Sequence, residues 1–248
     1  MYISMVKQRY ELLDTLRGFS LVNMIFYHFI WDLIYIFSVI DNVWPNLFYI
    51  WQQFICSSFI FISGFCWPLS HNHLRRGLTI FACGILITLV TYIFLPQNTI
   101  VFGILTFLGS AALFLLILPQ QLLKIKPLYG FILSLCLFIL SKNITRGYLG
   151  FSFCKISLPP EIYANHFTAY LGFPHDSFSS ADYFPLLPWL FLFSSGYYAY
   201  QYCYAKNILA KFSRKIFPPL NFCGKHSLFI YLIHQPLIYF ALSLSIDF

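Results

Sequence analysis

The chain has 248 residues, of which 59% are hydrophobic, 21% aromatic and only 9% charged, and its net charge is +7. So few charged residues cannot cover a soluble core with a polar surface, which excludes an ordinary soluble domain. Apolar runs of about 20 residues recur between short polar joints, and this is the length that a helix needs to cross a bilayer. The composition therefore predicts a polytopic membrane protein in which residues 1–248 form a single domain.

Seven membrane-spanning helices are predicted, and their runs are continuously apolar. A run such as GILITLVTYIFL lacks the alternation of barrel strands, so we expect an all-α helix bundle without regular β structure. In chain order, the predicted spans are residues 17–39, 47–67, 77–95, 101–118, 126–142, 183–204 and 226–245. The longest segment between spans, residues 143–182, is rich in Phe, Tyr, Pro and Gly and is predicted to pack as a cap on the outer side.

Basic residues fall unevenly on alternate joints between the spans. One set of joints has twelve: Lys7, Arg9, Arg17, Arg75, Arg76, Lys124, Lys126, Lys206, Lys211, Arg214, Lys215 and Lys225; the other set has three: Lys142, Arg146 and Lys155. Because cytoplasmic loops are enriched in Lys and Arg, this asymmetry predicts a cytoplasmic N-terminus and an external C-terminus. The cations then face the headgroups of membrane lipids, so the basic charge does not indicate nucleic-acid binding.

The first predicted span contains three ionisable residues, Arg17, His28 and Asp32, and a fourth, Asp14, lies one turn before Arg17. A helix turns 100° and rises about 1.5 Å per residue, so His28 lies on the same face as Arg17, about 16 Å deeper in the membrane. Asp32 follows one turn later, where its carboxylate can accept a hydrogen bond from one imidazole nitrogen and leave the other free as a base. The pattern predicts an anion-binding cation, a base and an orienting carboxylate.

Other interpretations of these residues remain open. Polar side chains in a bundle also form structural hydrogen bonds between helices, worth about 0.6 kcal/mol on average. Charged groups in lipid cost a few kcal/mol and occur mainly at functional sites, which favours a functional role for His28. Asp32 can instead be an interface residue, and Arg17 a topology anchor. A proton- or anion-coupled transporter or flippase also fits these residues, but an odd number of spans without an internal repeat argues against it.

The last predicted span carries the sequence YLIHQP. Pro236 cannot donate a hydrogen bond to the carbonyl of Leu232, so the helix is loosened there. His234 and Gln235 are therefore candidates to bind a substrate, and hydrogen bonding to the loosened turn is the alternative.

Further candidates lie at the ends of spans. Asp182 begins the sixth span and is predicted to cap a helix or to bind an acceptor. Arg75, Arg76 and Lys225 are candidates for binding phosphate, with membrane-topology anchoring as the alternative for the two arginines. His71, His73, His166 and His175 are interpreted as surface groups, and no pair of cysteines has the spacing of metal ligands.

Several motifs resemble a known family. LDTLRG before His28, FIFISGFCWPLS and the pair Arg75-Arg76 are similar to the membrane acyltransferase superfamily that modifies cell-surface carbohydrates. VFGILTFLG, DYFPLLPWLFLF and GKHSLFIYLIHQP are closer to the heparan-alpha-glucosaminide N-acetyltransferase catalytic-domain family, in particular its prokaryotic members. Many prokaryotic relatives carry His where this chain has Thr106.

The resemblance implies acyl transfer from cytosolic acyl-CoA, usually acetyl-CoA, to an amine or hydroxyl of an extracytoplasmic acceptor, either a glycan or a small molecule. On the matched positions, Arg17 lies at the cofactor end and His28 is the catalytic histidine. No metal is implied. A protein of this kind is expected in the inner membrane of a bacterium, with membrane lipids and the acceptor as its partners.

Overall fold

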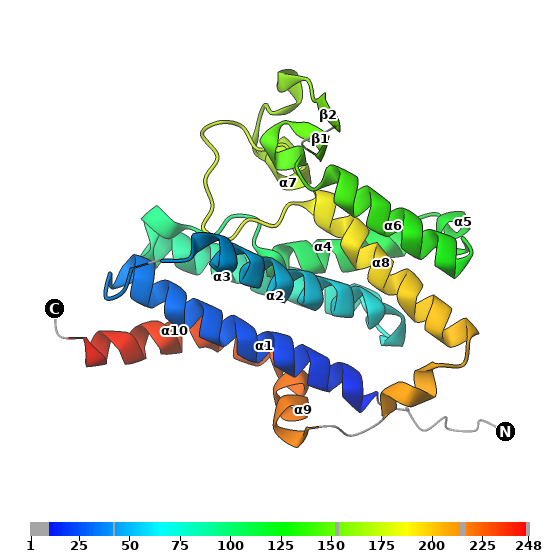
Figure 1. Cartoon of the computed structure of the whole chain (residues 1–248), viewed down its shortest axis with the longest axis horizontal. Helices are drawn as coiled ribbons and strands as arrows, with labels where there is room; N and C mark the ends of the chain where they lie inside the picture. Colours follow the sequence, from blue (N-terminus) through cyan, green and yellow to red (C-terminus); the bar gives the residue numbers. More distant parts are fainter. Residues whose placement is uncertain (1–9, 42, 152–153, 214–216, 247–248) are drawn as a thin grey trace. The chain divides into compact units, whose positions relative to one another are not determined.

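The computed structural model describes residues 10–41, 43–151, 154–213 and 217–246, and it is mostly helical (Figure 1). The chain divides into two compact units. Unit 1 comprises Met1–Ile62 and Cys203–Phe248, and unit 2 comprises Ser63–Tyr202.

The helices and strands of unit 1 come from both ends of the chain. They are α1 (Glu11–Trp31), the π-helical segment η1 (Asp32–Ile36), most of α2 (Pro45–Phe65), a 3₁₀ segment (Leu209–Ser213), α9 (Pro218–Lys225) and α10 (Ser227–Ser245). Unit 2 contains the last turn of α2, α3 (His73–Phe94), α4 (Ile104–Ile117), α5 (Gln120–Leu123), α6 (Pro127–Ser141), β1 (Tyr148–Phe151), β2 (Cys154–Ser157), α7 (His166–Leu171) and most of α8 (Leu186–Ala205).

Each of the seven predicted spans contains a helix: α1 with η1, α2, α3, α4, α6, α8 and α10. Among the described residues, five segments are long and apolar enough to cross a membrane: Glu11–Ile36, Pro45–Phe65, His73–Phe94, Pro127–Arg146 and Ser227–Ser245. Of the other two, α4 has only 14 residues and α8 is interrupted by a non-helical residue, Leu187. Seven spans and the orientation of the termini therefore stay predictions. Lys7, Arg9, Arg214 and Lys215 of the charge pattern lie outside the described residues.

In unit 1, glycines allow α1 to pack directly against α9. A Cβ atom on Gly18 would lie 1.9 Å from the carbonyl oxygen of Leu220, and one on Gly224 would lie 1.8 Å from that of Asp14. Small residues at a helix crossing let two backbones approach closely. Farther along α1, Leu21 and Met24 form a buried cluster with Ile55 of α2.

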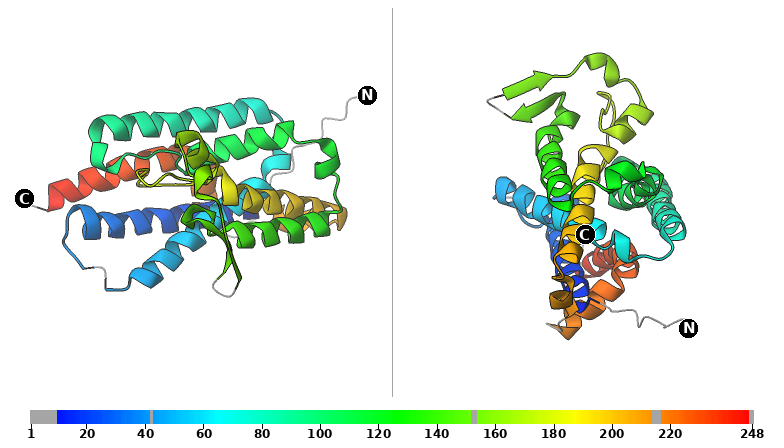
Figure 2. Two further views of the ribbon diagram at one scale, coloured as in Figure 1. Left: turned by 90° about the horizontal axis from the view of Figure 1, so that it is seen from above. Right: turned by 90° about the vertical axis from the view of Figure 1, so that its right-hand side faces the viewer.

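In unit 2, α3 and α4 lie side by side, as the views in Figures 1 and 2 agree in showing. Glycines again form the contact. A Cβ on Gly84 would lie 2.5 Å from the backbone nitrogen of Thr106, and one on Gly109 would lie 2.5 Å from that of Phe81. The residues of α4 from Ile104 to Ala112 are all buried. A helix that is apolar on all sides is buried on all sides, so α4 forms the core of this unit.

The predicted cap, residues 143–182, contains an antiparallel hairpin of β1 and β2 followed by the short helix α7. The expectation that regular β structure would be lacking is therefore wrong for this segment. It was derived from the apolar runs of the spans, whereas the cap carries Gly147 at φ 90° and Gly150 at φ 87°. These left-handed conformations suit glycine and allow the chain to turn into a hairpin.

We predict that Gly18→Ala destabilises unit 1 by about 3 kcal/mol, because the added methyl group would meet backbone rather than a movable side chain. The expected result is a lower thermal unfolding midpoint in detergent, measured by fluorescence-detected gel filtration. Leu16→Ala is the matched control, since Leu16 is exposed on the same helix. Equal midpoints for the two variants would contradict close packing of α1 on α9.

Candidate functional site

Four polar residues from the two ends of the chain converge in unit 1: His28 of α1, Asp32 of η1, and His234 and Gln235 of α10. The ring centroids of His28 and His234 are 5.0 Å apart. Asp32 is fully buried, and its two carboxylate oxygens accept hydrogen bonds from Nε2 of Gln235 at 2.8 and 3.0 Å. The fold thus joins the predicted base to the predicted substrate-binding pair.

The backbone fixes the orientation of His234. Its Nδ1 atom lies 2.5 Å from the carbonyl oxygen of Tyr231. A carbonyl can only accept, so Nδ1 carries the hydrogen and Nε2 carries a lone pair. Nε2 of His234 and Oε1 of Gln235 are both buried and have no hydrogen-bond partner among the described residues. Because buried polar atoms nearly always have partners, these two unsatisfied acceptors indicate a place for a ligand with hydrogen-bond donors.

Asp32 does not bind the residue that the sequence suggested. In the described part of the chain no hydrogen bond joins Asp32 to His28, and Gln235 occupies the carboxylate instead. The backbone changes from α- to π-helical at Asp32, where the amide of Phe37 donates to its carbonyl at 2.9 Å. Single π-helical turns often occur at functional sites. The predicted orientation of His28 by Asp32 is therefore corrected to an orientation of Gln235 by Asp32.

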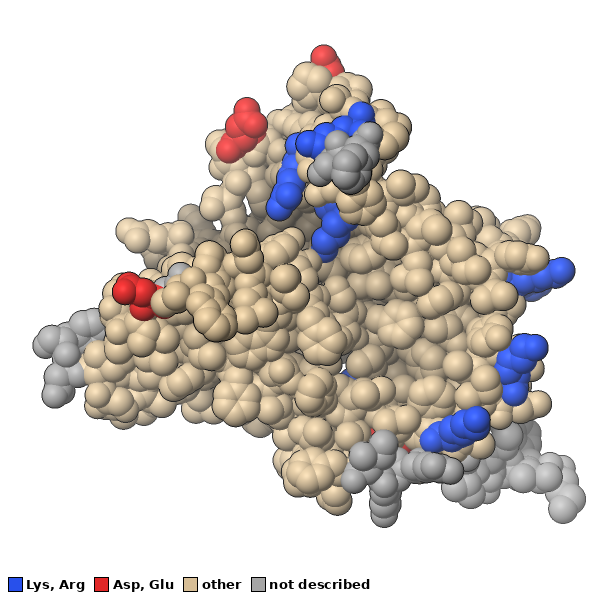
Figure 3. All heavy atoms as spheres, viewed as in Figure 1, with Lys and Arg blue, Asp and Glu red and all other residues tan. Residues whose placement is uncertain are grey.

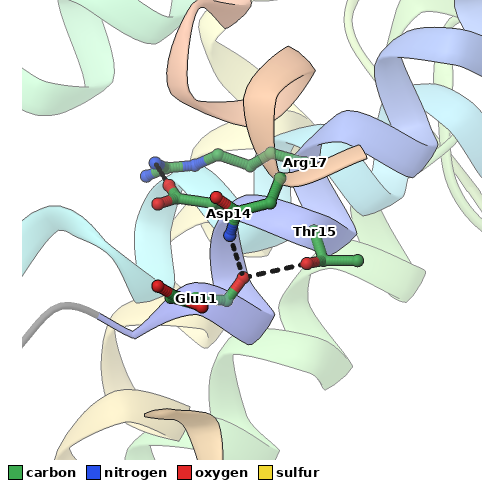
Figure 4. A network of polar contacts seen from close by, with 5 residues as sticks. Glu11, Asp14, Thr15 and Arg17 are labelled. Atoms are coloured by element: carbon green, nitrogen blue, oxygen red, sulfur yellow. Dashed lines mark hydrogen bonds and ion pairs between the residues drawn. The ribbon is translucent and has the colours of Figure 1, made fainter. Parts of the chain in front are cut away.

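Arg17 lies at the N-terminal end of α1 in a small polar network (Figure 4). Its guanidinium is 3.5 Å from the carboxylate of Asp14, and the carbonyl oxygen of Glu11 accepts a hydrogen bond from the Thr15 hydroxyl at 3.0 Å. Lys225 follows Gly224, which packs on the backbone of Asp14, so Lys225 lies at this same end and is exposed. Two of the four predicted phosphate-binding cations are therefore neighbours.

Arg75 and Arg76 lie in unit 2 at the start of α3. The side chain of Asn72 accepts a hydrogen bond from the Arg75 amide and so caps this helix. Arg76 lines a pocket of about 40 Å³ together with Ser63, Trp67, Ser70, His73, Ile80, Leu108, Ala112 and Phe193. Arg75 is not part of its lining.

His73 is the residue of this pocket that sequence analysis misinterpreted as a surface group. Its ring stacks on Trp67 with centroids 4.0 Å apart, and its Nδ1 atom is buried without a hydrogen-bond partner among the described residues. The indole of Trp67 is itself fixed by a hydrogen bond to the carbonyl of Ala112 at 3.0 Å. The sequence did contain a signal for this contact: Trp67 stands directly before Pro68, a few residues ahead of His73 and the basic start of α3.

Asp182 caps a helix, but not the one that it precedes. Its Oδ2 atom accepts a hydrogen bond from the backbone amide of Ile104 at 3.2 Å, so it caps α4 rather than α8. Burial raises the pKa of Asp182 to about 6, and the hydrogen bond from Ile104 lowers it in part. The expected cap of the sixth span is therefore corrected to a cap of α4, and a role in acceptor binding stays a prediction.

Five described segments of membrane-spanning length and apolar composition are typical of an integral membrane protein. Among the described residues, no group of three or more His, Cys, Asp or Glu side chains could hold a metal ion. Residues 9–236 match the family described as heparan-alpha-glucosaminide N-acetyltransferase, catalytic. The chain therefore belongs to this family of membrane acetyltransferases. Comparisons with curated proteins and with solved structures gave no match.

Asp182 should make the stability of unit 2 depend on pH. Because its pKa in the folded protein, about 6, is above the value of 3.8 in an unfolded chain, folding favours the protonated carboxyl. Stability from this residue is then greatest below about pH 4 and decreases as the pH rises to 6, by on the order of 1 to 3 kcal/mol.

We predict that Asp182→Asn removes this dependence, because the amide keeps an acceptor for Ile104 and carries no charge. Thermal unfolding midpoints at pH 4.5, 5.5 and 7.5 measure the effect. A variant whose midpoint changes with pH as steeply as that of the parent protein would show that Asp182 does not titrate in this range.

Proposed function

We propose that the protein is a membrane acetyltransferase of the bacterial inner membrane that transfers an acetyl group from cytosolic acetyl-CoA to an amine or hydroxyl of an extracytoplasmic carbohydrate. The observation that supports this most directly is the cluster of His28, His234, Asp32 and Gln235, with two buried acceptor atoms left for a ligand. All four residues lie within the segment that matches the acetyltransferase family.

His28 acts as the general base in this proposal. It removes a proton from the acceptor nitrogen or oxygen while that atom attacks the thioester carbonyl carbon. The new bond to the acetyl carbon forms as the carbon–sulfur bond breaks, and the proton finally resides on the sulfur of the released thiol. No oxidant or further reactant is needed, because the acceptor loses one hydrogen and the thiol gains one.

His234 and Gln235 hold the acceptor. With hydrogen on Nδ1, Nε2 of His234 can accept a hydrogen bond from the substrate, and Oε1 of Gln235 can accept a second one. Asp32 binds the amide nitrogen of Gln235, and this fixes which end of the amide faces the ligand. Fixed groups of this kind lower the entropic cost of bringing the acceptor to the base.

The anionic parts of the donor require cations, and the residues present fit this need. A guanidinium has five N–H donors, and the contact of Arg17 with Asp14 uses only one of its nitrogens, so Arg17 can also bind a phosphate. Lys225 is exposed at the same end of α1. Unit 2, taken by itself, offers Arg75 and Arg76 as alternative cations, and Arg76 borders a pocket with hydroxyl groups and a stacked Trp67–His73 pair.

We predict that His28→Ala lowers acetyl transfer by at least about 100-fold, the usual contribution of a general base. Purified protein in proteoliposomes is incubated with radiolabelled acetyl-CoA and amino sugars, and the label incorporated into sugar is measured. His226→Ala is the matched control, because His226 is an exposed histidine of the same unit.

Three outcomes would contradict the assignment. Full activity of His28→Ala together with an inactive His234→Ala variant would exchange the roles of the two histidines. Retained activity in both variants would remove the cluster from catalysis. Uptake of an unmodified solute without any labelled product would favour the transporter.

We predict that Asp32→Asn lowers kcat by about 10- to 100-fold and leaves KM for acetyl-CoA unchanged, since the cations at the other end of α1 are untouched. The asparagine would keep one oxygen as an acceptor for Nε2 of Gln235, but its own NH2 group would replace the other, so one of the two contacts becomes donor against donor. The double variant Asp32→Asn with Gln235→Glu restores a donor–acceptor pair and should recover part of the activity. Equal losses in kcat and acetyl-CoA affinity, without recovery, would indicate a purely structural role.

A further inference from the structure

The hairpin of β1 and β2 has one apolar face and one polar face. Leu149 pairs with Ile156, and Phe151 pairs with Cys154. Directly paired residues project to the same face and alternate along each strand, so these four side chains share a face. Phe151 is 46% exposed, Ile156 is 62% exposed, and Cys154 is also exposed. The described residues of unit 2 therefore leave most of this apolar face uncovered.

The hairpin is fixed to the end of a membrane-spanning helix. The candidate span Pro127–Arg146 ends two residues before Tyr148, where β1 begins. The side-chain amide of Asn143, just after α6, donates a hydrogen bond to the carbonyl of Gly150 in β1 at 2.9 Å. A Cβ atom on Gly150 would lie 2.1 Å from the carbonyl oxygen of Cys154, so the close approach of β1 to β2 depends on this glycine. Because the end of a span lies at the membrane surface, the hairpin is held at the depth of the lipid headgroups.

Three basic residues lie at this junction. Arg146 and Lys155 are exposed, and within the described residues neither forms an ion pair with a carboxylate. Nζ of Lys155 lies 4.8 Å from the ring centre of Tyr148, and Nζ of Lys142 lies 3.9 Å from that of Trp189. Figure 3 shows basic side chains gathered on the cap, with acidic side chains on the same projecting part of the molecule.

We infer that the hairpin with Lys142, Arg146 and Lys155, which we call the basic hairpin, is an interfacial anchor for anionic phospholipids. Its apolar face enters the boundary between headgroups and acyl chains, while the cations bind lipid phosphates. Amphipathic elements with a basic polar side bind anionic membranes in this way.

Charge and continuity favour lipid over a soluble partner as the occupant. The hairpin cannot leave the bilayer surface while α6 spans the membrane, so phosphates and acyl chains are always within its reach. An exposed face of Phe151 and Ile156 would be costly in water but favourable at the boundary of the acyl chains. The inference is independent of catalysis, because it concerns only the depth at which the cap is held.

The test measures the depth of a spin label in full-length protein in nanodiscs. Cys136 and Cys154, the exposed cysteines, are changed to Ser, and the label is placed through Ile156→Cys or, as a control elsewhere in the cap, through Glu161→Cys. Paramagnetic resonance then compares collisions with oxygen, which enters the bilayer, and with a water-soluble nickel chelate. In discs containing phosphatidylglycerol, we expect the label at position 156 to be at least about fivefold better protected from nickel than the label at 161.

Charge-reversal variants test the role of the cations. Arg146→Glu with Lys155→Glu should abolish the protection at position 156, whereas Lys124→Glu, an exposed lysine before α6, should leave it unchanged. Discs of phosphatidylcholine alone should give clearly weaker protection.

Three results would overturn the inference. The labels at 156 and 161 could be equally accessible to nickel in both kinds of disc, which would show that the hairpin does not contact the membrane. Protection could be equal in both lipids and insensitive to charge reversal, which would show that the cations do not bind anionic lipid. Lastly, phosphatidylglycerol could have no effect on position 156, while a soluble sulfated oligosaccharide protects this position in phosphatidylcholine discs. That result would assign the cations to a glycan.

Discussion

The pairing of Asp32 with Gln235 is the interaction on which the candidate site depends. A carboxylate that is fully buried on an apolar helix is costly unless donors satisfy its oxygens, and the Gln235 amide reaches both of them. This contact joins residues that are 203 positions apart in the sequence. By holding η1 against α10 it also sets the position of His28, one turn earlier, beside His234.

The same pairing leaves part of the site unsatisfied. The side-chain nitrogen of Gln235 donates to Asp32, whereas its side-chain oxygen Oε1 has no partner among the described residues. Nε2 of His234 also has no partner there. A fold optimised for stability alone would pair such buried atoms or replace them with apolar groups. Retaining two buried acceptors without a partner among the described residues is therefore an indication of ligand binding.

The sequence predicts the helices well because each depends on a local property, the length of an apolar run. It also predicts which residues of α1 share a face, since helix geometry alone determines that. It cannot predict partners that come from distant segments. Gln235 displaces His28 as the partner of Asp32, and Asp182 caps α4 because the chain returns to that helix after the cap. The hairpin was missed because glycines in left-handed conformations determine it, whereas its short strands carry little pattern.

Two contacts of different kinds hold α1 in register with the C-terminal helices. At one end, Gly18 and Gly224 let the backbones of α1 and α9 touch, and fourteen residues later Asp32 binds Gln235 of α10. At about 1.5 Å per residue these contacts are about 21 Å apart along the helix. A rotation or a sliding of α1 would break both at once, because the glycine contact tolerates no added atom and the carboxylate tolerates no loss of its donors. His28 lies between them, so its place beside His234 is fixed by packing on one side and by hydrogen bonds on the other.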